Sequence, residues 1–480
     1  MQKILSHLMQ YAQTLGVDYA DIRFKDILTE NITVEDGQVT EIARNRSQGY
    51  GIRVYSHGSM GFAASNDSSH MEDTLLRAFK IARASRELQA EKIVLSKKES
   101  VAGEYETPTV TDPFFVPLSD KLDLLMECDR VMRGQPGVAK AESSLDFRKE
   151  EVFFADTEGS ENILHQTFYQ SSGQVTARSV SESDMQERNY FNRVRAGYEG
   201  VLGLDLRGNA ERVARECAEL IDAPECPSGV FDIILTPRQL FLQIHESVGH
   251  PTELDRVFGS EAAFAGSSFV SADYLHTPLQ YGSEQVTIVA DAFSPLGLGT
   301  FGWDDEGVPA QRTVLVEKGM FKGFLTSRDN AAKIGETSHG MGLADGWRNM
   351  PIVRMTNINL LPGEFTLDEL IAGIEDGLLL DENKSWSIDD KRIHFQFACE
   401  IAREIKNGKL TGRIYKNPIY SGKTTEFWGS CDGVCDESHW RIIGVPNCGK
   451  GQPLQIMRVA HGSAPARFRN VKVGVADDAR

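Results

Sequence analysis

The stretch IHESVGHP, residues 244–251, restricts the local fold more than any other part of this sequence. It contains His245, Glu246 and His250, so it matches the H-E-x-x-H signature of zinc peptidases with one additional residue. In a straight α-helix, positions four apart differ by roughly 40°, whereas positions five apart differ by roughly 140°. A regular helix would therefore direct the two imidazoles to different sides, where they could not share one metal ion.

Two residues beside the second histidine predict that the helix does not stay regular. Gly249 loosens the last turn, and Pro251 disfavours the α conformation at His250. A wider, π-like turn would bring the two histidines back to one side, and such turns are frequent at functional sites. We therefore expect α geometry to fail by residues 248–251 and both histidines to bind one metal. The alternative is an ordinary helix end with two unrelated histidines.

The residues before the motif predict that it follows a buried strand. An apolar, β-rich run covers residues 230–235. Thr236 suits a helix N-cap, Pro237 suits the first helical position, and Gln239 is spaced to complete a capping box with Thr236. An apolar stripe then repeats every four residues, at Leu240, Ile244 and Val248. The expected order is strand, helix and then metal motif.

Length and composition indicate a chain of more than one domain without a membrane-spanning segment. Its 480 residues exceed what one hydrophobic core usually organises. The net charge of −18 argues against direct binding of nucleic acid or of anionic membranes. No apolar run is long enough to cross a bilayer. Seven cysteines and an N-terminus without a signal-peptide core predict reduced thiols in the cytoplasm.

The segment DAPECPSG, residues 222–229, is the best candidate for a linker between two domains. Before it, residues 1–223 mix predicted helices and strands, including a hairpin around an Asp36-Gly37 turn. After it, residues 229–480 are mostly predicted strands and include the metal-motif helix. The expected fold class is α+β, with an N-terminal α+β domain and a C-terminal, largely antiparallel β domain that carries the metal motif.

Two neighbouring loop motifs do not clearly indicate a second site. GLGTFG, residues 297–302, matches the dinucleotide pattern G-x-G-x-x-G, but no helix follows it, so we interpret it as a glycine-rich loop. The next residues contain the acidic run Asp304, Asp305 and Glu306. Such a run is usually solvated, although beside a metal it could bind the positive end of a substrate or orient a ligand histidine.

A catalytic zinc usually has three protein ligands, so the two histidines need a third. Local spacing favours Glu253, with Asp255 close by, and the more distant candidates are Cys448, His461 and His339. Cys431 and Cys435 could form a separate structural site with Cys448 and His439. Because structural zinc sites favour C-x-x-C spacing, we prefer to interpret that pair as ordinary thiols.

In sequence order, the chain carries many segments that resemble the TldD/PmbA family, described as metallopeptidases and as modulators of DNA gyrase. The N-terminal matches are ADIRF, EDGQV and GYGIRVYSHGSMGFAAS. The C-terminal matches are more specific: HESVGHPTELD, DDEGVPAQRTVLVEKG, RMTN, SWSIDDKR, EFWGSCD, NCGKGQP and HGSAPARF. The resemblance covers nearly the whole chain. Because only the TldD-like branch carries the histidine motif, the chain resembles the catalytic branch.

The resemblance implies roles for four residues. His245, His250 and Cys448 correspond to the metal ligands, and Glu246 corresponds to the acid/base residue. The resemblance also implies a two-domain fold and a dimer, either a homodimer or a heterodimer with a PmbA-like subunit. The substrates it implies are peptides or unfolded protein segments that enter an enclosed site.

From the motif and the resemblance together, we expect a zinc-dependent metallopeptidase. The metal would acidify a bound water and polarise the scissile carbonyl, while Glu246 transfers the proton. A thiolate ligand weakens the metal as a Lewis acid, so Fe(II) is the alternative to zinc. Two other functions fit the sequence: a non-enzymatic, metal-stabilised scaffold that regulates a partner protein, and a metal-dependent amidase of small molecules. For peptide binding, residues 352–360 are a candidate exposed edge strand, against the interpretation that they form a buried core strand.

Overall fold

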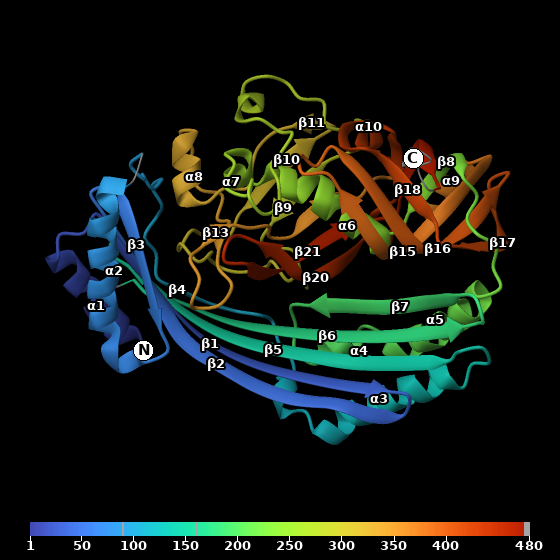
Figure 1. The fold of residues 1–480 in the computed structure, drawn as a ribbon, viewed down its shortest axis with the longest axis horizontal. Coiled ribbons are helices and arrows are strands. Elements are labelled where there is room, and N and C mark those ends of the chain that lie inside the picture. The colour runs from blue at the N-terminus through green and yellow to red at the C-terminus, as the bar shows by residue number, and fades with distance from the viewer. Residues whose placement is uncertain (89–90, 160–161, 475–480) are drawn as a thin grey trace.

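The computed structural model describes residues 1–88, 91–159 and 162–474, and its N-terminal part forms one long, curved sheet (Figure 1). The strand order is β3-β2-β1-β5-β6, and both β4 and β7 pair with β6. The C-terminal part lies against the concave face of this sheet (Figure 1). The strand bounds are β1 Tyr19–Glu35, β2 Gln38–Ser56, β3 Ser59–Ser65, β4 Gly103–Glu106, β5 Lys140–Asp156, β6 Leu164–Val180 and β7 Met185–Val194.

The β1–β2 hairpin turns at the predicted residues. Asp36 and Gly37 have φ values of 49° and 80°, and this pair of positive φ values is what a type I′ hairpin turn requires. Helices cover the other face of the sheet in two groups, each with its own apolar core. The first group is α1 Gln2–Thr14 and α2 Met71–Ser85, and the second is α3 Leu118–Arg133, α4 Glu199–Leu202 and α5 Leu206–Leu220.

The largest C-terminal sheet closes on itself. Its order is β15-β8-β22-β18-β16-β17, and β15 also pairs with β16. Only the β8–β15 pair in this sheet is parallel. The bounds are β8 Gly229–Leu235, β15 Asp376–Ile388, β16 His394–Lys406, β17 Lys409–Lys416, β18 Ile419–Lys423, β19 Cys431–Val434, which pairs with β22, and β22 Ala466–Val473.

Smaller sheets and short helices complete the C-terminal part. The four-stranded sheet runs β11-β10-β9-β14, and β20 forms a separate hairpin with β21.

Among the described residues, no helix is both long and apolar enough to cross a membrane. The remaining bounds are β9 Ile288–Asp291, β10 Arg312–Glu317, β11 Met320–Phe321, β12 Gly342–Leu343, β13 Ile352–Val353, β14 Ile358–Leu360, β20 Arg441–Lys450, β21 Gln455–Ser463, α6 Pro237–Ile244, α7 Leu254–Val257, α8 Arg328–Lys333, α9 Leu367–Ala372 and α10 Thr424–Gly429. The predicted α+β class, with a mainly antiparallel C-terminal part, is confirmed.

Two local predictions were wrong. The capping box at the start of α6 does not form, because the Thr236 hydroxyl donates to Asp381 Oδ1 at 2.6 Å instead of capping the helix. Residues 352–360 are not an exposed edge: Ile358 and Leu360 of β14 are fully buried, and β14 packs into the C-terminal core. The interpretation as a buried core strand is therefore correct.

The acidic run forms buried ion pairs between the N-terminal and C-terminal parts. Lys25 Nζ of β1 lies 3.0 Å from Asp305 Oδ1, and Arg53 Nη1 of β2 lies 2.8 Å from Glu306 Oε1. Asp304 accepts hydrogen bonds from the backbone N–H groups of Glu306, Val308 and Gly342. This run is therefore neither solvated nor a support for the metal-motif histidines; it joins the two parts of the molecule.

Candidate metal centre

The helix that carries the motif loses α geometry, as the sequence predicts, but it does so from His245, three residues before the predicted 248–251. α6 ends at Ile244, residues His245–Gly249 form a π-helical turn, and His250–Thr252 continue as a 3₁₀ turn. The imidazole rings of His245 and His250 lie with centroids 4.7 Å apart. Gly249 is needed for packing, because a Cβ at this position would overlap the Met355 side chain. The prediction that α geometry fails in the motif is confirmed.

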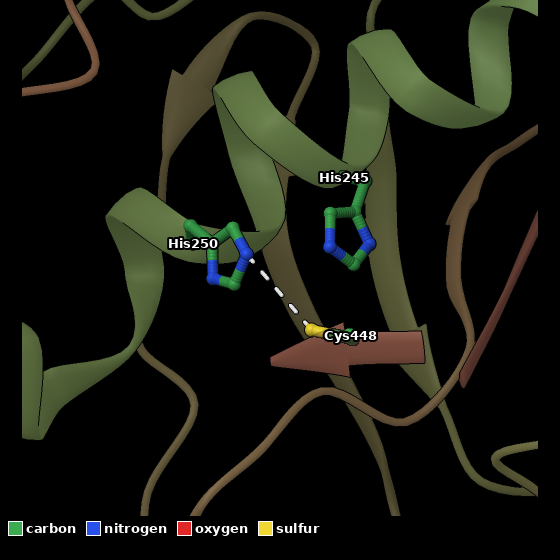
Figure 2. Close-up of side chains that lie close together, drawn as sticks. All are labelled: His245, His250 and Cys448. Carbon is green, nitrogen blue, oxygen red and sulfur yellow. Dashed lines mark hydrogen bonds between the residues drawn. The ribbon is translucent and has the colours of Figure 1, made fainter. Parts of the chain in front are cut away.

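Cys448 approaches the two histidines from a strand far away in the sequence. It lies in β20 beside a bulge between Val445 and Cys448, and the candidate ligand atoms of the three residues lie within 4.8 Å of one another (Figure 2). The Cys448 Sγ to His250 Nε2 distance is 3.9 Å. Burial opposes ionisation of the thiol, but the positive charge of Arg354 and the nearby His250 outweigh it and lower the pKa of Cys448. A thiol with a lowered pKa is suited to metal binding.

The hydrogen bonds of His250 determine which of its two ring nitrogens is available to bind a metal. His250 Nδ1 lies 2.9 Å from Glu253 Oε2, so it donates to this carboxylate and leaves the lone pair of Nε2 free. Arg256 and Lys450 surround Glu253, and they overcome the effect of burial and hold its pKa well below the ordinary value. Burial lowers the pKa of His250, which favours the neutral imidazole that a metal requires.

A chain of two hydrogen bonds orients His245 in the same way. His461 Nδ1 lies 3.1 Å from the Ile358 carbonyl oxygen, which can only accept, so this nitrogen carries the proton. The His461 Nε2 lone pair therefore accepts from His245 Nδ1, at 2.7 Å. His245 Nε2 is left unprotonated, and burial lowers the pKa of both rings. Both motif histidines thus hold Nε2 free as a ligand atom.

The other candidates for a third ligand lie outside this donor group. Glu253 accepts from Nδ1 of His250, and His461 accepts from Nδ1 of His245, so both lie on the side of these rings away from the free Nε2 atoms. Asp255 Oδ1 accepts from Lys450 Nζ at 2.7 Å, and His339 Nδ1 bonds to the Phe324 carbonyl oxygen. In the described parts of the chain, one cluster of three or more histidine, cysteine or acidic side chains is close enough together to share a metal ion. This cluster is formed by His245, His250 and Cys448. Cys431 and Cys435 accordingly form no such group.

Glu246 lies beside this cluster and is paired with an arginine that the sequence analysis did not single out. Arg392 Nη1 donates to Glu246 Oε2 at 2.7 Å, and Arg392 Nη2 donates to the Ala265 carbonyl oxygen at 3.2 Å. Arg392 has φ 64° in the turn between β15 and β16, where the Asp389 carboxylate accepts three backbone N–H groups. It is the last residue of SWSIDDKR, a segment matched to the family without an assigned role.

A cavity of about 530 Å³ is lined by these residues and by residues of the N-terminal part. We call it the metal-site cavity. One wall carries His245, Glu246, His250, Arg392 and Cys448 of the C-terminal part. The facing wall belongs to the N-terminal sheet and consists of Gln174 of β6 and Asn189, Phe191 and Arg193 of β7. Its size is that of pockets which bind small molecules or short peptide segments.

Profiles of one family match three segments of the chain. The PmbA/TldA metallopeptidase C-terminal domain matches residues 228–475, domain 1 matches residues 20–85, and the central domain matches residues 111–223. The chain belongs to the TldD/PmbA family. The metal-motif residues all lie within the C-terminal match. Because the profiles divide the N-terminal half into two segments, our two-domain boundaries, 1–223 and 229–480, stay a proposal.

Relatives of this TldD/PmbA family member extend over most of its length. It is 29% identical to a metalloprotease of Methanocaldococcus jannaschii over 92% of this chain and 94% of that protein. It is 22% identical to a protein of Saccharolobus solfataricus named a zinc metalloprotease TldD homolog, over 96% and 98% of the two chains. The crystal structure of TldE from Thermococcus kodakarensis has the same fold, with a TM-score of 0.76, 18% identity, and 98% and 100% coverage.

Proposed function

We propose that this TldD/PmbA family member is a zinc-dependent metallopeptidase that hydrolyses peptides or unfolded protein segments. The observation that carries the proposal is the group of three buried donors beside Glu246 at the wall of the metal-site cavity. His245, Glu246, His250 and Cys448 are only 4–6% exposed. Two neutral imidazoles and a thiol of lowered pKa are a donor set that suits zinc and leaves a position open for substrate or water. Fe(II) is the alternative metal for this set.

The residues present divide the chemistry among them. When bound, the metal would polarise the scissile carbonyl and make a water molecule more acidic. His245, His250 and Cys448 would hold it through Nε2, Nε2 and Sγ. Glu246 accepts the proton of the attacking water on its carboxylate and delivers it to the leaving amine. Arg392, which donates to Glu246 Oε2, holds that carboxylate at the cavity wall.

The cavity supports peptides as the substrate class. Its walls come from both parts of the molecule, and the donors are too deeply buried to reach a folded protein surface. A flexible chain can enter such a space, whereas a folded domain cannot. A metal-dependent amidase of small molecules would use the same residues, and comparing a peptide with a small amide as substrate separates the two. A non-enzymatic scaffold would not need Glu246 beside the donors.

The proposal extends to assembly and location. We propose a dimer, formed by two copies of this chain or with a PmbA-like subunit; the T. kodakarensis protein of the same fold is named TldE. All seven cysteines are free, in keeping with the reducing cytoplasm, where we place the protein.

Glu246→Gln tests the proposed function directly. The variant keeps the shape of the side chain and the three donors but cannot accept a proton, so peptide hydrolysis should fall roughly 10²- to 10⁴-fold. The measurement is hydrolysis of an unstructured peptide beside metal content by elemental analysis. Glu426→Gln, an exposed exchange of the same kind on α10, is the matched control. Unchanged hydrolysis in Glu246→Gln would refute the mechanism and favour the scaffold.

A further inference from the structure

A second cavity, of about 70 Å³, lies between the N-terminal sheet and the β20–β21 hairpin. Four cationic side chains line it: Lys25 of β1, Arg148 of β5, Arg195 immediately after β7, and Arg458 of β21. We call it the arginine pocket. It shares no lining residue with the metal-site cavity. Its chemistry is therefore not explained by the proposed peptidase function.

Two of the four cations have anionic partners and two do not. Arg148 Nη2 lies 2.7 Å from Glu150 Oε2, and Lys25 Nζ lies 3.3 Å from Glu150 Oε1. Arg195 donates to the Leu298 carbonyl oxygen, but its buried Nε has no partner. In the described parts of the chain, no carboxylate lies within ion-pair distance of Arg195 or Arg458. Glu150 attracts both guanidinium groups, and Asp345 attracts Arg458, only from beyond ion-pair distance, so neither arginine has a direct anionic partner.

Three carboxylates, of Glu150, Asp305 and Asp345, face the four cations of the pocket, so one positive charge is in excess. Asp305 pairs with Lys25, and Asp345 accepts from the backbone N–H of Ile456. Burial lowers the pKa of Arg195 and of Arg458 to about 10, and repulsion by Arg148 contributes to the change at Arg458. The Arg195 guanidinium stacks 4.3 Å over the Phe168 ring, and this cation–π contact offsets part of the free-energy cost of burying its charge. A bound anion would offset the remaining cost of burying the charges of Arg195 and Arg458.

We propose that the arginine pocket binds a small oxyanion. Guanidinium groups recognise phosphate and carboxylate oxygens through paired N–H donors. The volume of about 70 Å³ holds about five to seven water-sized spheres at roughly 10–15 Å³ each, which is room for an ion of five heavy atoms such as orthophosphate. The same chemistry would accept the terminal carboxylate of a peptide.

The position of the pocket gives the bound ion a structural role. Arg148 lies in the N-terminal sheet, Arg195 directly follows its strand β7, and Arg458 lies in β21, so one anion would join the two parts of the molecule. Arg458 follows Met457, which pairs with Cys448 across the β20–β21 hairpin. Binding at this pocket would thus steady the strand that presents Cys448, without any contact with the metal.

Isothermal titration of the full-length protein with sodium phosphate tests the proposal, at ionic strength held constant with sodium chloride. We expect saturable binding of one phosphate per chain and a rise in the thermal midpoint of unfolding. Arg458→Gln should weaken phosphate binding at least tenfold, and Arg458→Lys should retain part of it. The matched control is Arg413→Gln, because Arg413 is exposed on β17 and remote from the pocket.

The source of the anion is distinguished by competition. If a short peptide with a free C-terminal carboxylate displaces phosphate and its amidated form does not, the pocket accepts peptide termini; if neither displaces it, free phosphate is the ligand. Absence of saturable phosphate binding, or equal binding by Arg458→Gln and Arg413→Gln, would overturn the proposal. Circular dichroism establishes that each variant is folded, and Arg195→Gln provides a second variant if Arg458→Gln unfolds. Phosphate binding is measured without peptide hydrolysis, so its failure leaves the peptidase proposal intact.

Discussion

The two walls of the metal-site cavity carry different kinds of side chain. The C-terminal wall presents donors and charged groups whose orientations are fixed by buried hydrogen bonds, as in the His245–His461 pair. The N-terminal wall presents Phe191, Arg193 and two amides from β6 and β7 of a regular sheet. The C-terminal wall carries the proposed metal ligands, whereas the N-terminal wall carries none of them and can only touch what enters the cavity. Metal binding and substrate binding should therefore respond to mutations on opposite walls.

The largest expected effect comes from removing the strand donor. Cys448→Ser should lose most of the bound metal and with it peptide hydrolysis, because a hydroxyl is a far poorer zinc ligand than a thiolate. Elemental analysis of the purified protein measures the loss. Cys435→Ser, also a buried cysteine of this part of the chain, should keep its metal. If Cys448→Ser retained full metal content, Cys448 would not be a ligand.

A smaller effect is expected at Arg392, which should act on catalysis while leaving the metal in place. Arg392→Gln removes a charged hydrogen bond to Glu246, and such bonds contribute about 1.5–3 kcal/mol, or about 10- to 100-fold in rate. We expect kcat to fall by this amount at unchanged metal content. Arg392→Lys should restore part of the rate. Loss of metal together with activity would mean that Arg392 serves the fold of the site instead.

His461→Gln tests the hydrogen-bond chain behind His245. Removing the partner of a ligand histidine typically costs about 10- to 100-fold in metal affinity. We expect the lower end of this range, because the partner is a neutral imidazole and not a carboxylate. Competition with a chelator of known affinity measures the change. His394→Gln, at an exposed histidine of β16, is the control, and equal affinities in the two variants would contradict the proposed orientation of His245.

The smallest effect is expected on the N-terminal wall. Phe191→Leu shortens an aromatic side chain that lines the cavity and contacts Phe241 edge-on. Aromatic contacts contribute about 0.5–1.5 kcal/mol beyond their buried area, so KM for a peptide should rise about 2- to 10-fold. Metal content should not change, and Phe115→Leu, at an exposed position outside the cavity, should alter neither quantity. A metal defect in Phe191→Leu would break the division between the two walls.

The sequence predicted those features that depend on neighbouring residues. The π-helical turn followed from Gly249 and Pro251 beside His250, and the first hairpin followed from Asp36-Gly37. The role of Glu253 was harder to predict, because its spacing suits a ligand as well as a partner of His250. Only the side-chain direction in the folded structure separates the two.

Other features of the site depend on contacts between segments that are far apart in the sequence. The spacing of apolar residues along the chain does not predict such contacts. Arg392 lies 146 residues from Glu246, and His461 lies 216 residues from His245. The arginine pocket combines β1, β5, the end of β7 and β21, none of which has an unusual local pattern. For the same reason, the sequence did not predict that the acidic run at 304–306 is buried in ion pairs. Its partners, Lys25 and Arg53, lie in the first two strands of the chain.

The separation of Cys448 from His250 by 198 residues also sets a time order during synthesis. A ribosome makes the two motif histidines long before it makes Cys448, and the carbonyl of Ile358 and the ring of His461 that orient His245 also come later. A nascent chain that has reached only the histidines and Glu253 holds two donors without the third, and His245 still lacks its partner. Metal capture should therefore be a late event, which would keep the proposed hydrolytic group inactive until the β20–β21 hairpin has folded onto α6.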